Sequence, residues 1–165
     1  MKRWLVIVMV AALLCGCGAQ PVFERVEDTD MVSAAAAVRQ VKLDLPQEAA
    51  SPAMESADGG AYYQCDGYVL TVQTLPGGDL DRTLRHVTGF SGSQLQMIKT
   101  KAGPAVRYNT VWTAAGEGGD QVGRALILDD GQNHYAVTVM ANAASAGDLQ
   151  ETWNILFSSV TLDAD

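Results

Sequence analysis

The sequence has few basic residues for its length. Lys and Arg number 11 and Asp and Glu number 19 among 165 residues, which gives a formal net charge of −8 at pH 7. A nucleic-acid-binding domain normally presents a basic face. This charge balance therefore argues against a nucleic-acid partner, while an apolar content of 48% is sufficient for a folded core.

Cysteine and histidine are also scarce. The three cysteines are Cys15, Cys17 and Cys65, and the two histidines are His86 and His134. Zinc motifs usually show paired ligands at short spacings, and these residues are scattered singly. We expect no metal, no cofactor and no disulfide scaffold, and we interpret Cys65 as a buried structural thiol.

No apolar run is long enough to span a membrane. The longest extends from Trp4 to Leu14, directly after Lys2 and Arg3. A spanning helix needs about 20 apolar residues. A short apolar run behind a cationic start is instead typical of a secretory signal.

The end of this run resembles the lipobox of bacterial lipoproteins. Leu14 lies three residues before Cys17 and the small Gly16 directly before it, as in that family. The resemblance implies cleavage before Cys17, with residues 1–16 as signal peptide. It also implies that the Cys17 thiol receives a diacylglycerol with acyl chains such as palmitate. The alternative is an ordinary secretory signal with incidental cysteines.

A lipidated Cys17 would place the protein in the cell envelope. Two acyl chains make a stable membrane anchor, so we expect the chain to sit on the extracytoplasmic face of the cell membrane. Residues 17–40 then form a flexible tether, which as a coil spans roughly 25–29 Å. Residues 41–165 form one globular domain, which we expect to be a monomer.

Apolar periodicity predicts the elements of this domain. Alternation with a period of two indicates strands at residues 41–45, 61–65, 68–75, 95–101, 106–114, 122–128, 134–140 and 160–162. Residues between 46 and 60 are predicted to be a loop.

Two helices are predicted between these strands. Asp79 is a suitable N-cap for a helix that carries Leu80, Leu84 and Val87 on one face and ends at Gly89. A second helix is predicted to start after Ser145. Its apolar stripe consists of Leu149, Trp153, Leu156 and Phe157. The order predicts an α+β fold, a single antiparallel sheet covered by two helices.

The order of elements over residues 41–165, ending in the segment Leu-Phe-Ser-Ser-Val-Thr-Leu, resembles two groups of proteins. One is the PsbP-like fold of photosystem II extrinsic proteins. The other is a set of uncharacterised lipoproteins of anaerobic Gram-positive bacteria. The resemblance implies an α+β sandwich and brings no catalytic residue with it.

The binding surface is predicted at four residues. Tyr62 and Tyr63 are adjacent on a strand, so they point to opposite faces and one should be exposed. Arg82 and Arg85 lie on the first helix, where they either contact an anion or form an ordinary solvated face.

No nucleophile, acid and base converge in the sequence, so we expect a non-catalytic binding module. Its partner would be an envelope protein or a small-molecule ligand. The alternative is an envelope hydrolase that uses the loop carboxylates Asp120, Asp129 and Asp130. Strongly shifted pKa values at two carboxylates in one cleft would favour that alternative.

Replacing Cys17 tests the anchor. The variant Cys17→Ser should abolish labelling by radioactive acyl precursors and shift the protein out of the detergent phase, because the acylated thiol is gone. Mass spectrometry that found an unmodified Cys17 in the native protein would contradict the lipobox interpretation.

Overall fold

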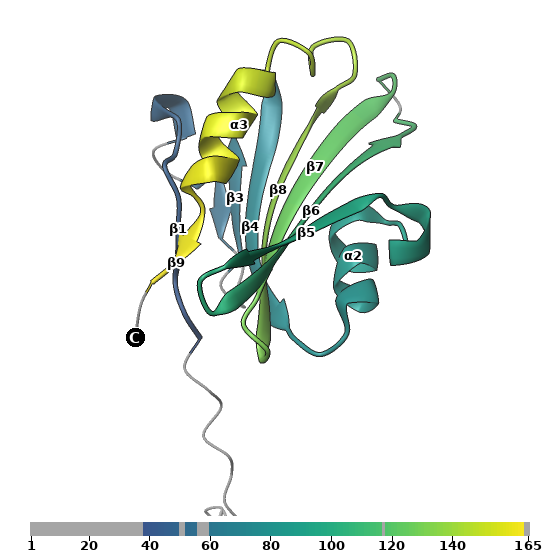
Figure 1. Ribbon diagram of the computed structural model, residues 1–165. Coiled ribbons are helices and arrows are strands. Elements are labelled where there is room, and N and C mark those ends of the chain that lie inside the picture. Colours follow the sequence, from purple (N-terminus) through teal and green to yellow (C-terminus); the bar gives the residue numbers. More distant parts are fainter. Residues whose placement is uncertain (1–37, 50–51, 56–59, 117, 164–165) are drawn as a thin grey trace, which may run out of the picture. The chain divides into compact units, whose positions relative to one another are not determined.

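The computed structural model describes residues 38–49, 52–55, 60–116 and 118–163 (Figure 1). All of them belong to the compact unit Ala35–Asp165. The predicted signal peptide, Leu14, Gly16 and Cys17 lie outside the described residues.

The described residues form nine strands, two α-helices and two short 3₁₀ helices. In chain order they are β1 (Val41–Lys42), η1 (Gln47–Ala49), β2 (Met54–Glu55), β3 (Ala61–Gln64), β4 (Tyr68–Pro76), α2 (Leu80–Thr88), η2 (Gly92–Gln94), β5 (Met97–Ala102), β6 (Ala105–Ala114), β7 (Gln121–Asp129), β8 (Asn133–Asn142), α3 (Gln150–Ser159) and β9 (Thr161–Leu162).

Seven strands form one antiparallel sheet in the order β2-β3-β4-β8-β7-β6-β5, and β1 pairs with β9 in a separate two-stranded sheet. The prediction of a single sheet is therefore wrong in this detail, although the α+β class agrees with the structure. The strand expected at residues 41–45 ends at Lys42. The backbone N–H of Asp44 donates to the Ser159 hydroxyl instead of to a strand (2.8 Å).

The two helices lie on opposite faces of the large sheet. On one face, which we call the α3 face, Trp153 and Phe157 of α3 belong to a core cluster with Val137 of β8. On the other face, the α2 face, Leu84 packs with Ile127 and Ala136. Successive strand residues point to opposite faces, so β7 and β8 are buried from both sides.

The structure confirms the caps that the sequence predicts for helix α2. The Asp79 carboxylate accepts from the backbone N–H of Arg82 (3.0 Å), and Gly89 closes the helix with a φ of 80°. Glycine adopts that left-handed conformation without steric strain because it has no Cβ. A local cap at each end therefore sets the length of this helix.

Helix α3 begins later than predicted. Residues before Gln150 form turns, in which the Ser145 hydroxyl donates to the Asn142 carbonyl (3.1 Å) instead of capping a helix. The apolar stripe is nevertheless buried, with Trp153 0% exposed. Tyr68 meets Trp153 edge to face, with ring centroids 6.2 Å apart. Neither α2 nor α3, the helices described, is long and apolar enough to cross a membrane.

Segment β2 is the element that the sequence pattern missed. It lies in the predicted loop and pairs Met54 with Tyr62 and Glu55 with Ala61. Two residues contain too few positions to show alternation. The pairing places β2 at one edge of the sheet, and β5 is at the other.

Truncating Trp153 should unfold much of the domain. Replacing a buried Trp by Ala typically costs about 3–5 kcal/mol, and a domain of this size commonly has only about 5–15 kcal/mol of stability. We expect Trp153→Ala to lower the urea midpoint sharply. Ile155→Ala is the control because Ile155 lies on the same helix and is 60% exposed. An unchanged midpoint for Trp153→Ala would contradict the assignment of Trp153 to the core.

Candidate functional site

The two tyrosines predicted to form a binding surface lie on opposite faces, as expected from their adjacency. Both are half-buried, so neither is the freely exposed ring that was predicted. Tyr63 packs against the core on the α3 face. Tyr62 lines a shallow hollow on the α2 face beside Val69 and Met140.

The arginines of α2 are exposed and do not join Tyr62 in that hollow. Arg85 Nε donates to Asp81 (2.7 Å), and the backbone N–H of Gly92 donates to the same carboxylate (2.6 Å). The hydrogen bond from Arg85, followed by that from Gly92, lowers the pKa of Asp81. Arg85 thus helps to fix the chain after α2.

The three loop carboxylates do not converge. Asp120 precedes β7, whereas Asp129 and Asp130 end it, so they lie at opposite ends of a nine-residue strand. Burial raises the pKa of Asp130, but hydrogen bonds from Asn133, Gln132 and the Tyr135 hydroxyl outweigh it and lower the pKa overall. Asp130 is thus engaged in closing the β7–β8 turn.

Cys65 and the histidines are also apart. Cys65 is buried in the α3-face core. His134 is buried on β8, where its Nδ1 lies 2.7 Å from the Thr83 hydroxyl and its Nε2 lies 3.7 Å from Asp129. His86 is exposed on α2. Within the described ranges, no three His, Cys, Asp or Glu side chains form a possible metal site.

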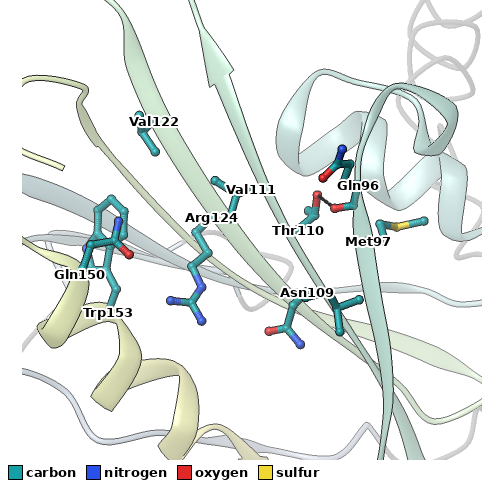
Figure 2. A pocket seen from close by; sticks show the side chains of 10 residues that line it. Gln96, Met97, Asn109, Thr110, Val111, Val122, Arg124, Gln150 and Trp153 are labelled. Carbon is teal, nitrogen blue, oxygen red and sulfur yellow. Dashed lines mark hydrogen bonds between the residues drawn. The ribbon is translucent and has the colours of Figure 1, made fainter. Parts of the chain in front are cut away.

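A groove on the α3 face combines apolar and polar side chains from four elements, β5, β6, β7 and α3. It runs between α3 and the strands β5 and β6, with a volume of about 430 Å³, and we call it the α3 groove. Its lining residues, drawn in Figure 2, are Gln96, Met97, Ile98, Asn109, Thr110, Val111, Val122, Arg124, Gln150 and Trp153.

Apolar side chains in the groove are exposed. Ile98 of β5 is 67% exposed and Val111 of β6 is 56% exposed. Val122 is half-buried beside them, and Trp153 lines the groove from the core side. The Trp153 indole N–H has no hydrogen-bond partner among the described residues. Exposed apolar surface in a concave site is typical of ligand binding.

Arg124 is the single charged residue among those that line the groove. Its Nη1 donates to the Asn154 side chain of α3 (2.6 Å), and its guanidinium lies 4.6 Å from the centroid of the Phe157 ring. Figure 2 shows this guanidinium between α3 and the side chain of Asn109. Burial, and then repulsion by Arg107, lower the pKa of Arg124.

Arg107 lies on the same face, in a second hollow of about 550 Å³ between the β5–β6 turn and the C-terminal segment. Its Nη2 donates to the carbonyl of Phe157 in the last turns of α3. Its Nε is buried and has no hydrogen-bond partner within the described part of the chain. Burial lowers the pKa of Arg107.

Sequence reasoning missed this site although β7 carries a signal for it. Arg124 lies in phase with Val122, Leu126 and Leu128, the positions that point to the α3 face. A charged residue at a core-facing position of an apolar strand is unusual. That irregularity was the available clue.

No protein-family model matches the sequence, and no curated protein matches it. Among solved structures, the fold is similar to that of LpqN, a protein involved in cell envelope biogenesis of Mycobacterium tuberculosis. The TM-score is 0.50 and the sequence identity is 14%, over 80% of this chain and 88% of LpqN. At this identity the likeness concerns the fold, and it agrees with the α+β class. The PsbP-like resemblance stays a prediction.

Replacing Arg124 tests whether its charge stabilises the fold. No carboxylate within the described ranges pairs with Arg124, and a Met of similar length keeps the contact with Phe157. We expect Arg124→Met to change the free energy of unfolding by less than about 1 kcal/mol, measured by urea denaturation. Breaking a buried ion pair costs about 3–5 kcal/mol. A loss of that size would mean that Arg124 has an acidic partner in the remainder of the chain.

Proposed function

We propose that this protein is a lipid-anchored, extracytoplasmic binding module that is monomeric and not catalytic. It holds the apolar part of a small-molecule ligand in the α3 groove. One observation carries the proposal. The groove places exposed apolar side chains, above all Ile98 and Val111, next to the half-buried cation Arg124.

The chemistry of the lining supports binding over catalysis. The polar side chains of the α3 groove are amides, one hydroxyl and one guanidinium, contributed by Gln96, Asn109, Thr110, Arg124 and Gln150. General bases and nucleophiles in enzymes are usually His, Cys, Asp, Glu or an activated Ser. Amides and a guanidinium are instead suited to orienting a bound molecule.

The dimensions of the groove suit a small molecule. Ligand pockets usually enclose about 300–1,000 Å³ and combine an apolar lining with a few polar groups. The α3 groove encloses about 430 Å³ and has this composition. It also lies between elements of regular structure, α3 and a β-hairpin, which hold its walls in fixed positions.

Placement in the envelope rests on two independent supports. The residues from Lys2 to Cys17 resemble a lipoprotein signal. The structural neighbour LpqN is involved in cell envelope biogenesis. A tether of residues 17–40 would, as a coil, hold the domain at a typical distance of roughly 25–29 Å from the anchor. An apolar ligand that leaves the membrane would then be within reach of the groove.

A fluorescent alkyl probe tests the proposal. The mature chain from residue 17, carrying Cys17→Ser to avoid acylation, should bind dansyl-labelled undecanoate with a saturable rise in dansyl emission. Val111→Ser should weaken binding about tenfold, because burying a Val side chain contributes about 1.5 kcal/mol and 1.4 kcal/mol corresponds to a factor of ten.

Met140→Ser is the matched control. Met140 is an apolar strand residue that is 42% exposed, but it lies on the α2 face. The proposal requires that this variant bind the probe like the parent chain. Emission that does not saturate, or equal weakening by Val111→Ser and Met140→Ser, would contradict binding in the α3 groove.

A further inference from the structure

Two arginines and an asparagine occupy one stretch of the α3 face. Arg107 and Asn109 are two residues apart on β6, so their side chains leave the same face of the sheet. The register pairs Asn109 with Leu126, which is two residues from Arg124 on β7. Asn109 therefore lies between the two arginines. Both guanidinium groups also reach the same residue of α3, because Arg107 donates to the Phe157 carbonyl and Arg124 lies 4.6 Å from the centroid of the Phe157 ring.

Neither arginine is neutralised within the described residues. Acidic residues outnumber basic ones by 19 to 11 in the chain. Even so, the described ion pairs join Arg85 with Asp81 and His134 with Asp129, and neither of them includes Arg107 or Arg124. Burial lowers the pKa of Arg107.

Contacts within the fold use only part of the hydrogen-bonding capacity of this group. A guanidinium has five N–H donors. Arg107 donates one to the Phe157 carbonyl, and Arg124 donates one to Asn154. The Asn109 side chain makes no hydrogen bond within the described residues. Unused donors of Arg124 and Asn109 thus remain in the α3 groove, and unused donors of Arg107 remain in the second hollow.

Stability alone does not explain why both side chains are charged. Both are half-buried, so each charge loses part of its hydration without a carboxylate partner among the described residues. The C-terminal carbonyls of a helix favour a nearby cation, which accounts for the contact of Arg107 with Phe157. It does not account for Arg124, which contacts the middle of α3 through Asn154.

We propose that the ligand of the α3 groove is an anionic amphiphile. Its oxyanion, a carboxylate or a phosphate, binds between Arg107 and Arg124 with Asn109 as a further donor, and its alkyl chain lies over Val111 and Ile98. This inference rests on the proposed function and adds the charge of the ligand to it. Guanidinium groups bind carboxylate and phosphate through paired N–H donors, which suits them to this task.

The acidic residues near this group are few. None of the residues that line the α3 groove is acidic, and Asp163 is the single acidic residue among those that line the hollow around Arg107. The Asp163 carboxylate accepts from the backbone N–H of Gln40 (2.9 Å). The charge of the site is therefore positive in a protein that is acidic overall.

Amphiphiles that share one chain and differ in headgroup test the inference. Isothermal titration of the mature Cys17→Ser chain, below micelle-forming concentrations, would compare decanoate, decanol and decyltrimethylammonium. Charge-assisted hydrogen bonds contribute about 1.5–3 kcal/mol, so decanoate should bind at least tenfold more tightly than decanol. The cation should bind most weakly. Added salt should reduce the advantage of decanoate, and acetate or free phosphate without a chain should bind weakly.

The variants locate the headgroup. Arg124→Met and Arg107→Met should each remove most of the advantage of decanoate and leave decanol binding unchanged. Arg124→Lys should restore part of it. Lys101→Met is the control, because Lys101 is an exposed cation on the same β5–β6 hairpin at a position that points to the α2 face. A circular dichroism spectrum and urea midpoint like those of the parent would show that each variant is folded.

Four results would overturn the inference. Equal affinities for decanoate and decanol would mean that the groove binds the alkyl chain and does not recognise an anionic headgroup. Arginine variants that keep the full preference for decanoate would place the headgroup elsewhere. Tight binding of free phosphate or acetate would make the site a simple anion site. If none of the decyl compounds binds, the proposed function fails as well. In that case, a dimer in solution that Val111→Asp disrupts would identify a second copy of this chain as the occupant of the groove.

Discussion

Burial of β7 and β8 from both sides is the constraint on which the other elements depend. Leu126 and Leu128 face α3, whereas Ile127 between them faces α2. A strand with apolar side chains on both faces must be covered on both faces. The two helices therefore lie on opposite faces of the sheet, and the chain places one before β5 and the other after β8.

The α3 groove follows from the width of a helix. With side chains an α-helix is about 10–12 Å across, and neighbouring strands are about 4.8 Å apart, so α3 covers between two and three strands. On one flank, Leu43, Leu45 and Ala49 pack against the α3-face core beside Tyr63. Figure 1 shows this segment on the side of α3 away from β5 and β6. Among the described residues, no segment covers the opposite flank in this way, and Ile98 and Val111 are exposed there.

Sequence signals within a few residues predicted the elements that local contacts form, but they did not predict contacts between distant parts of the chain. Helix α2 has a cap at Asp79 and a left-handed glycine at Gly89, both of which are visible in a few residues of sequence. The pairing of Val41 with Leu162 joins the two ends of the domain. No short segment encodes it, so the second sheet was missed. The site was missed because Arg124 shows its unusual position only when the strand is known, and the sequence does not show which elements lie opposite it.

The two arginines make different contacts within the fold, and this difference is relevant to function. Arg107 satisfies a carbonyl near the end of α3, a group that would otherwise need water or another donor. Arg124 contacts an exposed amide and an aromatic ring that any long side chain could cover. An anionic ligand between the two arginines, as proposed above, would give the charge of Arg124 a role that these contacts do not.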